Sequence, residues 1–213
     1  MKRPLLLVEI VLVGIVLTGF LCGASPTAFG SGAKTVLVLG DSISAAYGIQ
    51  RDTGWVALLA ARVGNDHPGD VVVNASVSGE TTEGGLARLP AALTKHVPDI
   101  VVLELGGNDA LRGYPVERIE ANVDAMVVLV ERAGARAVLV GMRIPPNYGP
   151  RYANAFAALF EDIAKRHHVA FVPFPLIDVA ADPDMMQADG IHPTAAAQGK
   201  ILEHVLAVLE PLL

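Results

Sequence analysis

From Thr35 to the C-terminus, short apolar runs alternate with longer segments that mix apolar and polar residues. The runs are rich in Val, Leu and Ile without a period of two, which is typical of strands buried on both faces of a sheet. In the longer segments apolar residues recur every three or four positions, which is typical of amphipathic helices. The predicted strands are Thr35–Leu39, Val71–Asn74, Ile100–Leu105, Ala137–Gly141 and Val169–Pro173, and the predicted helices are Trp55–Val63, Leu86–His96, Val116–Ala133, Tyr152–His167 and Ala195–Leu209.

The order of these elements predicts an α/β fold. Strand and helix alternate along the whole region, and right-handed crossovers between parallel strands place helices on both faces of the sheet. We therefore predict a three-layer α/β/α sandwich with a five-stranded parallel sheet in flavodoxin-like order. In such folds ligands bind beyond the carboxyl ends of the strands, so the residues after each apolar run are the candidates for a functional site.

The N-terminus has the layout of a secretory signal peptide. Lys2 and Arg3 precede an apolar stretch, and small residues follow it in GASPTA. The uninterrupted apolar part, residues 10–21, is short for a membrane-spanning helix. We predict cleavage after Ala24, or alternatively after Ala28, and a protein that is periplasmic or secreted, with no permanent membrane anchor.

The predicted domain organisation is a signal peptide at 1–24, a linker at 25–34 and one domain at 35–213. An uncleaved anchor is the alternative for the leader. Lipid attachment at Cys22 is disfavoured because the bulky Leu21 stands where lipoprotein signals have a small residue.

Composition and charge narrow the classes of partner. The chain has one cysteine, Cys22, so the exported protein would contain neither a disulfide nor a thiol nucleophile. The formal net charge is −6 and basic residues are not clustered, which argues against nucleic acid as a partner. No Cys or His spacing is typical of a structural metal, so we expect no metal and no cofactor. For the oligomeric state we expect a monomer or a weak oligomer.

The stretch VLVLGDSISAAYG places Asp41 and Ser42 directly after the first predicted strand. Side-chain oxygens at such a position commonly cap the following helix, and this stretch alone favours a cap. The alternative is that Ser42 is a nucleophile at the carboxyl edge of the sheet. A serine hydroxyl is a weak nucleophile near neutral pH, so this alternative requires a base and donors for an oxyanion.

The other strand ends supply these parts. His192 is the candidate base, and Asp189 is close enough in sequence to orient its imidazole. The candidate oxyanion donors are the backbone N–H groups of Ser42 and Gly79 and the side-chain amide of Asn108. Each of these segments is also an ordinary turn sequence when taken singly, and for Asp41 a helix cap remains favoured. Their joint occurrence at one sheet edge favours the nucleophile interpretation of Ser42.

Four blocks carry a family resemblance: GDSIS at 40–44, the Gly79 segment, GGND at 106–109 and DGIHP at 189–193. They resemble the SGNH, or GDSL-type, hydrolases. VNASVSGETTEGGLARLP, DIVVLELGGNDALRG, GMRIPPNYGPRYANAF and MQADGIHPTA are similar to the branch of bacterial periplasmic arylesterases, also described as acyl-CoA thioesterase I and lysophospholipase L1. The resemblance implies the same assignment: Ser42 as nucleophile, Asp189 and His192 completing the triad, and Gly79 and Asn108 completing the oxyanion hole.

Two loops and a methionine are candidates for substrate binding. The segment at 110–115 contributes Leu111, Arg112 and Tyr114, and the segment at 142–148 contributes Ile144 and Pro145. Met185 is a further candidate because methionine adapts to irregular ligands. Surface loops and plain core packing are the alternatives.

These features predict a serine hydrolase that cleaves carboxylic esters and thioesters through an acyl-enzyme, with lysophospholipids among the candidate substrates. A carbohydrate O-deacetylase is the alternative enzyme, although aromatic residues make up only 5% of the chain. A non-catalytic periplasmic lipid binder is the alternative outside enzymes. A nucleotide binder is disfavoured because no Gly-rich phosphate loop is present.

Overall fold

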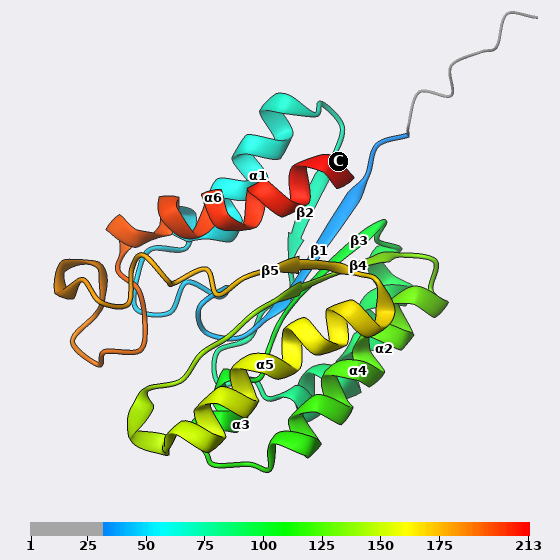
Figure 1. The fold of residues 1–213 in the computed structure, drawn as a ribbon. Helices are drawn as coiled ribbons and strands as arrows, with labels where there is room; N and C mark the ends of the chain where they lie inside the picture. The colour runs from blue at the N-terminus through cyan, green and yellow to red at the C-terminus, as the bar shows by residue number, and fades with distance from the viewer. Residues whose placement is uncertain (1–31) are drawn as a thin grey trace, which may run out of the picture. The chain divides into compact units, whose positions relative to one another are not determined.

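The computed structural model describes residues 32–213, so the predicted signal peptide and most of the predicted linker lie outside the described residues. Five parallel strands form one sheet in the order β2-β1-β3-β4-β5 (Figure 1). This order confirms the predicted flavodoxin-like α/β fold. The strands are β1 (Thr35–Gly40), β2 (Val71–Asn74), β3 (Ile100–Glu104), β4 (Arg136–Val140) and β5 (Ala170–Val172).

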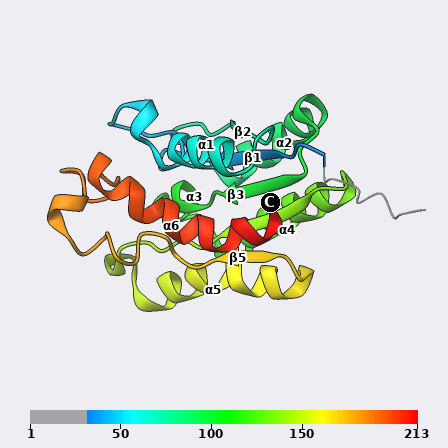
Figure 2. The same cartoon turned by 90° about the horizontal axis from the view of Figure 1, so that it is seen from above.

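Helices cover both faces of the sheet, as predicted. In Figure 1, α1 (Trp55–Asp66) and α6 (Gln198–Leu209) lie above the sheet, and Figure 2 shows the same two helices from above. The opposite face carries α2 (Thr82–His96), α4 (Val116–Arg132) and α5 (Pro150–His167). The long loop between β5 and α6, orange in Figure 1, extends beyond the sheet.

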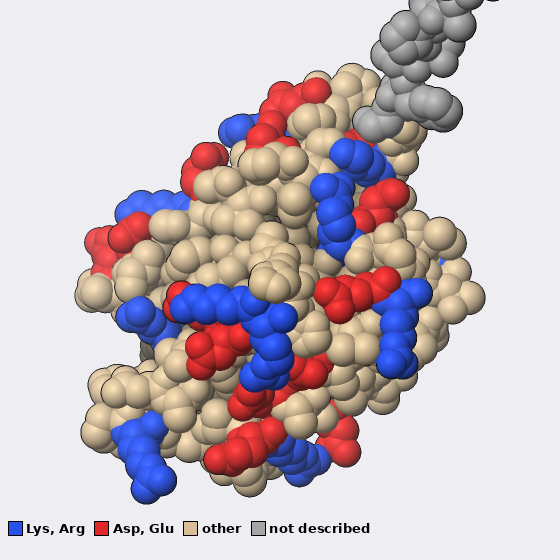
Figure 3. Space-filling model, turned by 45° about the vertical axis from the view of Figure 1, so that its right-hand side comes forward, with Lys and Arg blue, Asp and Glu red and all other residues tan. Residues whose placement is uncertain are grey.

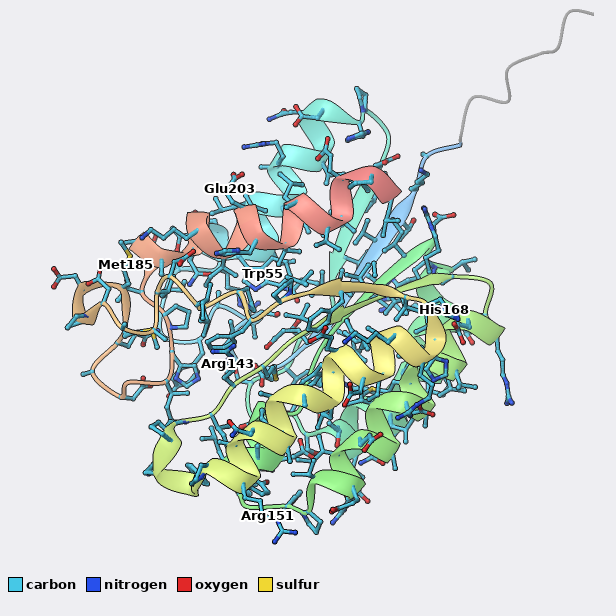
Figure 4. All side chains as sticks on the ribbon, viewed as in Figure 1. Trp55, Arg143, Arg151, His168, Met185 and Glu203 are labelled. Atoms are coloured by element: carbon cyan, nitrogen blue, oxygen red, sulfur yellow. The ribbon has the colours of Figure 1, made fainter. Side chains whose placement is uncertain are left out.

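Each layer of helices encloses its own hydrophobic core. Successive strand residues point to opposite faces, so Leu37 and Leu39 of β1 pack with α2, α4 and α5, whereas Val36 and Val38 pack with α1 and α6. Trp55 belongs to the second core, is 1% exposed and lies below α6 in Figure 4. The prediction that Trp55 packs in the core is confirmed.

Two local predictions were wrong. The run at β2 was expected to be buried on both faces, but β2 is an edge strand and Val71 is 52% exposed. Residues 107–111 form a short helix, α3, where the sequence predicted only a turn. Gly106, which precedes this helix, has a φ of +125° and packs so closely against the α5 side that an added Cβ would lie 3.2 Å from Phe160 Cζ. The positive φ requires glycine there, and the close packing further disfavours a side chain.

Acidic and basic side chains are interspersed on the face shown in Figure 3, and no stretch of that face carries basic residues alone. Within residues 32–213, no helix is long and apolar enough to cross a membrane.

Candidate active site

Ser42 lies in a tight turn that follows β1. The backbone closes on itself here, because Ala45 N–H donates to Asp41 O at 2.9 Å and Tyr47 N–H donates to Ser42 O at 3.0 Å. No helix starts at this point, so the interpretation of Asp41 as a helix cap is wrong. Gly40 leaves room for the turn, because an added Cβ would lie 2.6 Å from Glu104 Oε2 and 2.7 Å from the Ser44 side chain.

The structure brings Ser42, His192 and Asp189 into one hydrogen-bonded chain. His192 Nε2 lies 2.8 Å from Ser42 Oγ, and His192 Nδ1 lies 2.7 Å from Asp189 Oδ2. An ionised carboxylate only accepts hydrogen bonds, so the Nδ1 proton faces Asp189 and Nε2 is left to accept the proton of the Ser42 hydroxyl. This tautomer is the one that a general base for Ser42 requires.

Asp189 is held in its charged form by the residues that follow it. Its Oδ1 accepts the backbone N–H groups of Ile191 at 2.9 Å and His192 at 3.0 Å. These hydrogen bonds and the one from the His192 ring lower the pKa of Asp189 from 3.8 to about 2. Gly190, with a φ of +67°, makes the sharp turn that brings carboxylate and imidazole together. A spacing of three residues is therefore enough to build this contact.

The candidate oxyanion donors lie at the carboxyl ends of the neighbouring strands. Asn108 is in the first turn of α3, and its Nδ2 donates to Asp41 Oδ2 at 3.1 Å. Gly79 lies in the turn after β2 with a φ of +79°. Within residues 32–213, neither the backbone N–H of Ser42 nor that of Gly79 donates a hydrogen bond to another backbone group or to a side chain. These donors are thus available to a bound oxygen atom.

Two buried carboxyl groups lie beneath the nucleophile turn. Asp41 and Glu104 are each 3% exposed, and Glu104 Oε2 accepts the backbone N–H of Asp41 at 3.2 Å and the hydroxyl of Ser44 at 2.6 Å. Burial raises the pKa of Asp41 to about 6, while burial and the nearby Asp41 charge raise the pKa of Glu104 well above its usual value. Both shifts favour the neutral forms of these carboxyl groups, and the Asp41 side chain is the one that Asn108 contacts.

Ser42 and His192 open into a cavity of about 630 Å³. Most of its wall is apolar, and it is built from the segment after β4 and from the loop after β5. Such a volume is within the usual range for small-molecule sites. Among the lining residues are Leu111, Ile144, Pro145, Ile177, Met186 and Ile191.

Three of the six predicted substrate-binding residues belong to this wall: Leu111, Ile144 and Pro145. Arg112, Tyr114 and Met185 do not line the cavity, which corrects the expectation for each of them. The guanidinium of Arg112 donates to Gly79 O at 3.2 Å, and Tyr114 packs against the first core. Met185 packs against the second core, and in Figure 4 it lies on the loop between β5 and α6, at the left of the view.

Comparison with the models of known protein families shows which family this chain belongs to. The model of the GDSL-like lipase/acylhydrolase family matches residues 38–200, which include every member of the hydrogen-bonded chain described above. The chain belongs to the GDSL-like lipase/acylhydrolase family. The family resemblance inferred from the four sequence blocks is confirmed.

Relatives in this family share most of the chain. "Esterase TesA" of Pseudomonas aeruginosa is 50% identical over 181 residues, which cover 85% of this chain and 90% of the relative. "Thioesterase 1/protease 1/lysophospholipase L1" of Escherichia coli K12 is 43% identical over 182 residues, 84% of this chain and 85% of the relative. A crystal structure of TesA superposes with a TM-score of 0.82 at 49% identity and covers 84% of this chain and 100% of that structure.

Several residues around this GDSL-type site were not predicted from the sequence. Glu104 could have been noticed as an acidic residue inside an apolar strand. Phe174 and Ile177 line the cavity but lie in an aperiodic loop, so no pattern in the sequence marked them. Within the described chain, no group of three or more His, Cys, Asp and Glu side chains is placed to hold a metal ion.

Replacing Asn108 with alanine is expected to lower kcat for ester hydrolysis by about 10²–10³-fold, the usual cost of losing one oxyanion donor. KM should change little, because the donor interacts with charge that develops only in the transition state. The matched control is Asn154→Ala on the exposed side of α5, which should retain full activity. Equal kcat for Asn108→Ala and Asn154→Ala would remove Asn108 from the oxyanion site.

Proposed function

We propose that this protein is a serine esterase that hydrolyses carboxylic esters and thioesters of acyl chains, with Ser42 as nucleophile, His192 as general base and Asp189 as the group that orients the base. One observation carries the proposal. The chain from Ser42 Oγ to His192 Nε2 at 2.8 Å, continued from His192 Nδ1 to Asp189 at 2.7 Å, ends at the wall of an apolar cavity of about 630 Å³. The names of the relatives, an esterase and a thioesterase, agree with it.

In the acylation half-reaction, Ser42 Oγ forms a bond to the carbonyl carbon of the substrate while His192 Nε2 takes the hydroxyl proton. The carbonyl oxygen becomes an oxyanion, which the N–H groups of Ser42 and Gly79 and the Asn108 amide stabilise. The negative charge of Asp189 stabilises the imidazolium that forms. When the tetrahedral intermediate collapses, His192 donates its proton to the leaving alcohol or thiol, and Ser42 is left esterified.

In the deacylation half-reaction, a water molecule takes the position of the leaving group. His192 Nε2 removes a proton from this water as its oxygen attacks the acyl carbon, and the same donors stabilise the second oxyanion. Collapse releases the carboxylic acid and returns the proton to Ser42 Oγ. Every proton transfer uses side chains of this chain, and none requires a cofactor.

The cavity supports acyl chains as the part of the substrate that is bound. Apolar side chains from α3, the segment after β4 and the loop after β5 form most of its wall. Burying one methylene group against such a wall is worth about 0.8 kcal/mol, so each added carbon should strengthen binding until the cavity is full.

Export to the periplasm, with removal of residues 1–24, is part of the same proposal. It rests on the charged, apolar and small-residue segments of the leader. Acyl esters and thioesters are the proposed partners, and lysophospholipids are proposed as one class among them.

The test is a series of p-nitrophenyl acyl esters from acetate to palmitate, measured as kcat/KM on the protein lacking residues 1–24, with Ser42→Ala alongside. We expect kcat/KM to rise from acetate toward medium chains and activity to disappear in the variant. Cleavage of acetate alone would instead favour a deacetylase. Binding of fatty acid without any hydrolysis would show a lipid binder.

A further inference from the structure

The loop that carries His192 contributes no strand to the sheet, and Leu176 and Val179 anchor its first part in the second core. It leaves β5 at Val172 and reaches α6 only at Gln198, and between them the chain makes a single isolated bridge, Met186 with Pro193. Ser42, by contrast, follows directly on the central part of the sheet. Contacts between the part of the loop next to His192 and the turn after β1 therefore bear directly on the separation of nucleophile and base.

Gln187 makes these contacts. Its side-chain Nε2 donates to Tyr47 O at 2.8 Å, in the nucleophile turn, and to Pro193 O at 3.0 Å, next to the base. Its backbone N–H donates to His192 O at 2.7 Å. Between residues 41–50 and 182–194, all within the described chain, the hydrogen bonds are this contact with Tyr47 and the Ser42–His192 bond itself.

The surroundings of the Gln187 side chain fit an amide group. Both partners of Nε2 are carbonyl oxygens, so only a group with two N–H donors satisfies them together. Gly48 leaves the space that the side chain occupies, because a Cβ added there would collide with Gln187 Oε1. Tyr47 is also tied to Ser42 through its backbone N–H, and its ring lies 4.5 Å from the His192 ring between centroids. The carbonyl that Gln187 contacts therefore belongs to the same hydrogen-bonded turn as the nucleophile.

We propose that Gln187 is a positioning residue that fixes the distance between Ser42 and His192 by joining the two segments that carry them. This inference rests on the proposed esterase function and names no additional step in it. Gln187 is outside the cavity lining, so it should affect the chemical step and leave substrate binding unchanged.

The expected result for Gln187→Leu, which keeps the volume and removes both donors, is a fall in kcat of about tenfold to a hundredfold, the usual effect of a misplacement near 1 Å. KM should stay within about twofold, because a positioning defect alters the reacting geometry alone. Gln187→Glu should lose at least as much, since its carboxylate would face two carbonyl oxygens. Rates are divided by the active-site concentration, titrated with an alkyl fluorophosphonate, so that misfolded molecules do not count.

Gln50→Leu is the matched control, because Gln50 is an exposed glutamine near the same turn whose side chain makes no hydrogen bond within the described residues. It should retain wild-type kcat. Wild-type kcat per titrated site in both Gln187 variants would overturn the proposal, as would a parallel loss in Gln50→Leu. Wild type and Ser42→Ala in the same assays separate this failure from a failure of the esterase function, which would show as an inactive wild type or an active Ser42→Ala.

Discussion

Replacing Ser42 with alanine is expected to lower kcat/KM for ester substrates by about 10⁴-fold or more, the scale seen when a triad nucleophile is removed. The variant has no oxygen that can form the acyl-enzyme, and the residual rate reflects the oxyanion donors and substrate binding alone. The fold should be unaffected, because the change removes one partly exposed oxygen whose sole hydrogen bond within the described residues is to His192. The measurement is kcat/KM for a medium-chain p-nitrophenyl ester, with the midpoint of thermal unfolding recorded on the same sample.

Ser78→Ala is the matched control for this substitution. Ser78 is an exposed serine at the same edge of the sheet, next to Gly79. It should retain wild-type kcat/KM. If Ser42→Ala turned over substrate at the rate of Ser78→Ala, Ser42 would not be the nucleophile.

Replacing Asp189 with asparagine is expected to lower kcat by about 10³–10⁴-fold, the scale known from other triads. The amide group of asparagine can donate to His192 Nδ1, and this contact would stabilise the tautomer whose proton is on Nε2. That tautomer cannot accept the Ser42 proton. The measurement is kcat across the pH range, compared with wild type.

The pH profile of the wild type adds a further expectation. With a pKa of about 2, Asp189 stays ionised across the whole range in which an imidazole titrates. Protonation of Asp189 should therefore not account for a fall in rate on the acid side. The matched control is Asp124→Asn, which alters an Asp–His contact of 2.9 Å between α4 and α5 and should leave kcat unchanged. Comparable kcat in Asp189→Asn and Asp124→Asn would contradict the assigned role.

The sequence predicted the sheet well because a parallel sheet buried on both faces leaves a simple pattern. The strand at Val71–Asn74 was placed at its observed ends, and the other strands within two residues. The pattern does not reveal which strand is at the edge, so the exposure of Val71 was missed. The helix α3 was missed because Gly106, Gly107 and Asn108 have poor helix propensity, and tertiary packing decides their conformation.

The candidate site could be predicted only where residues close in sequence form it. Asp189 and His192 are three residues apart and meet through one turn, so spacing was a sufficient guide. The cavity wall depends on the path of the loop after β5, and the sequence of this loop shows no periodicity from which that path could be predicted. For this reason Ile177 was not foreseen. Met185 was chosen in error, although the neighbouring Met186 does line the cavity.

The buried carboxyl pair, Asp41 and Glu104, could not be predicted from the sequence. Asp41 resembles a helix cap when only its neighbours in sequence are considered, and its contacts with Asn108 and Glu104 come from other strand ends. Long-range contacts of this kind bury a carboxyl group beside Asn108, a candidate oxyanion donor. The burial of a carboxyl group is unfavourable for stability, and such unfavourable features are typical of functional sites.

The central claim, that Ser42 forms a covalent intermediate with the help of His192, is tested most directly by mapping an adduct. The protein is treated with an alkyl fluorophosphonate, and the modified residue is located by peptide mass spectrometry in wild type, Ser42→Ala and His192→Ala. We predict one adduct per chain, on Ser42, absent in the first variant and formed far more slowly in the second. An adduct on another residue, or full esterase activity in a protein whose Ser42 is modified, would contradict the mechanism.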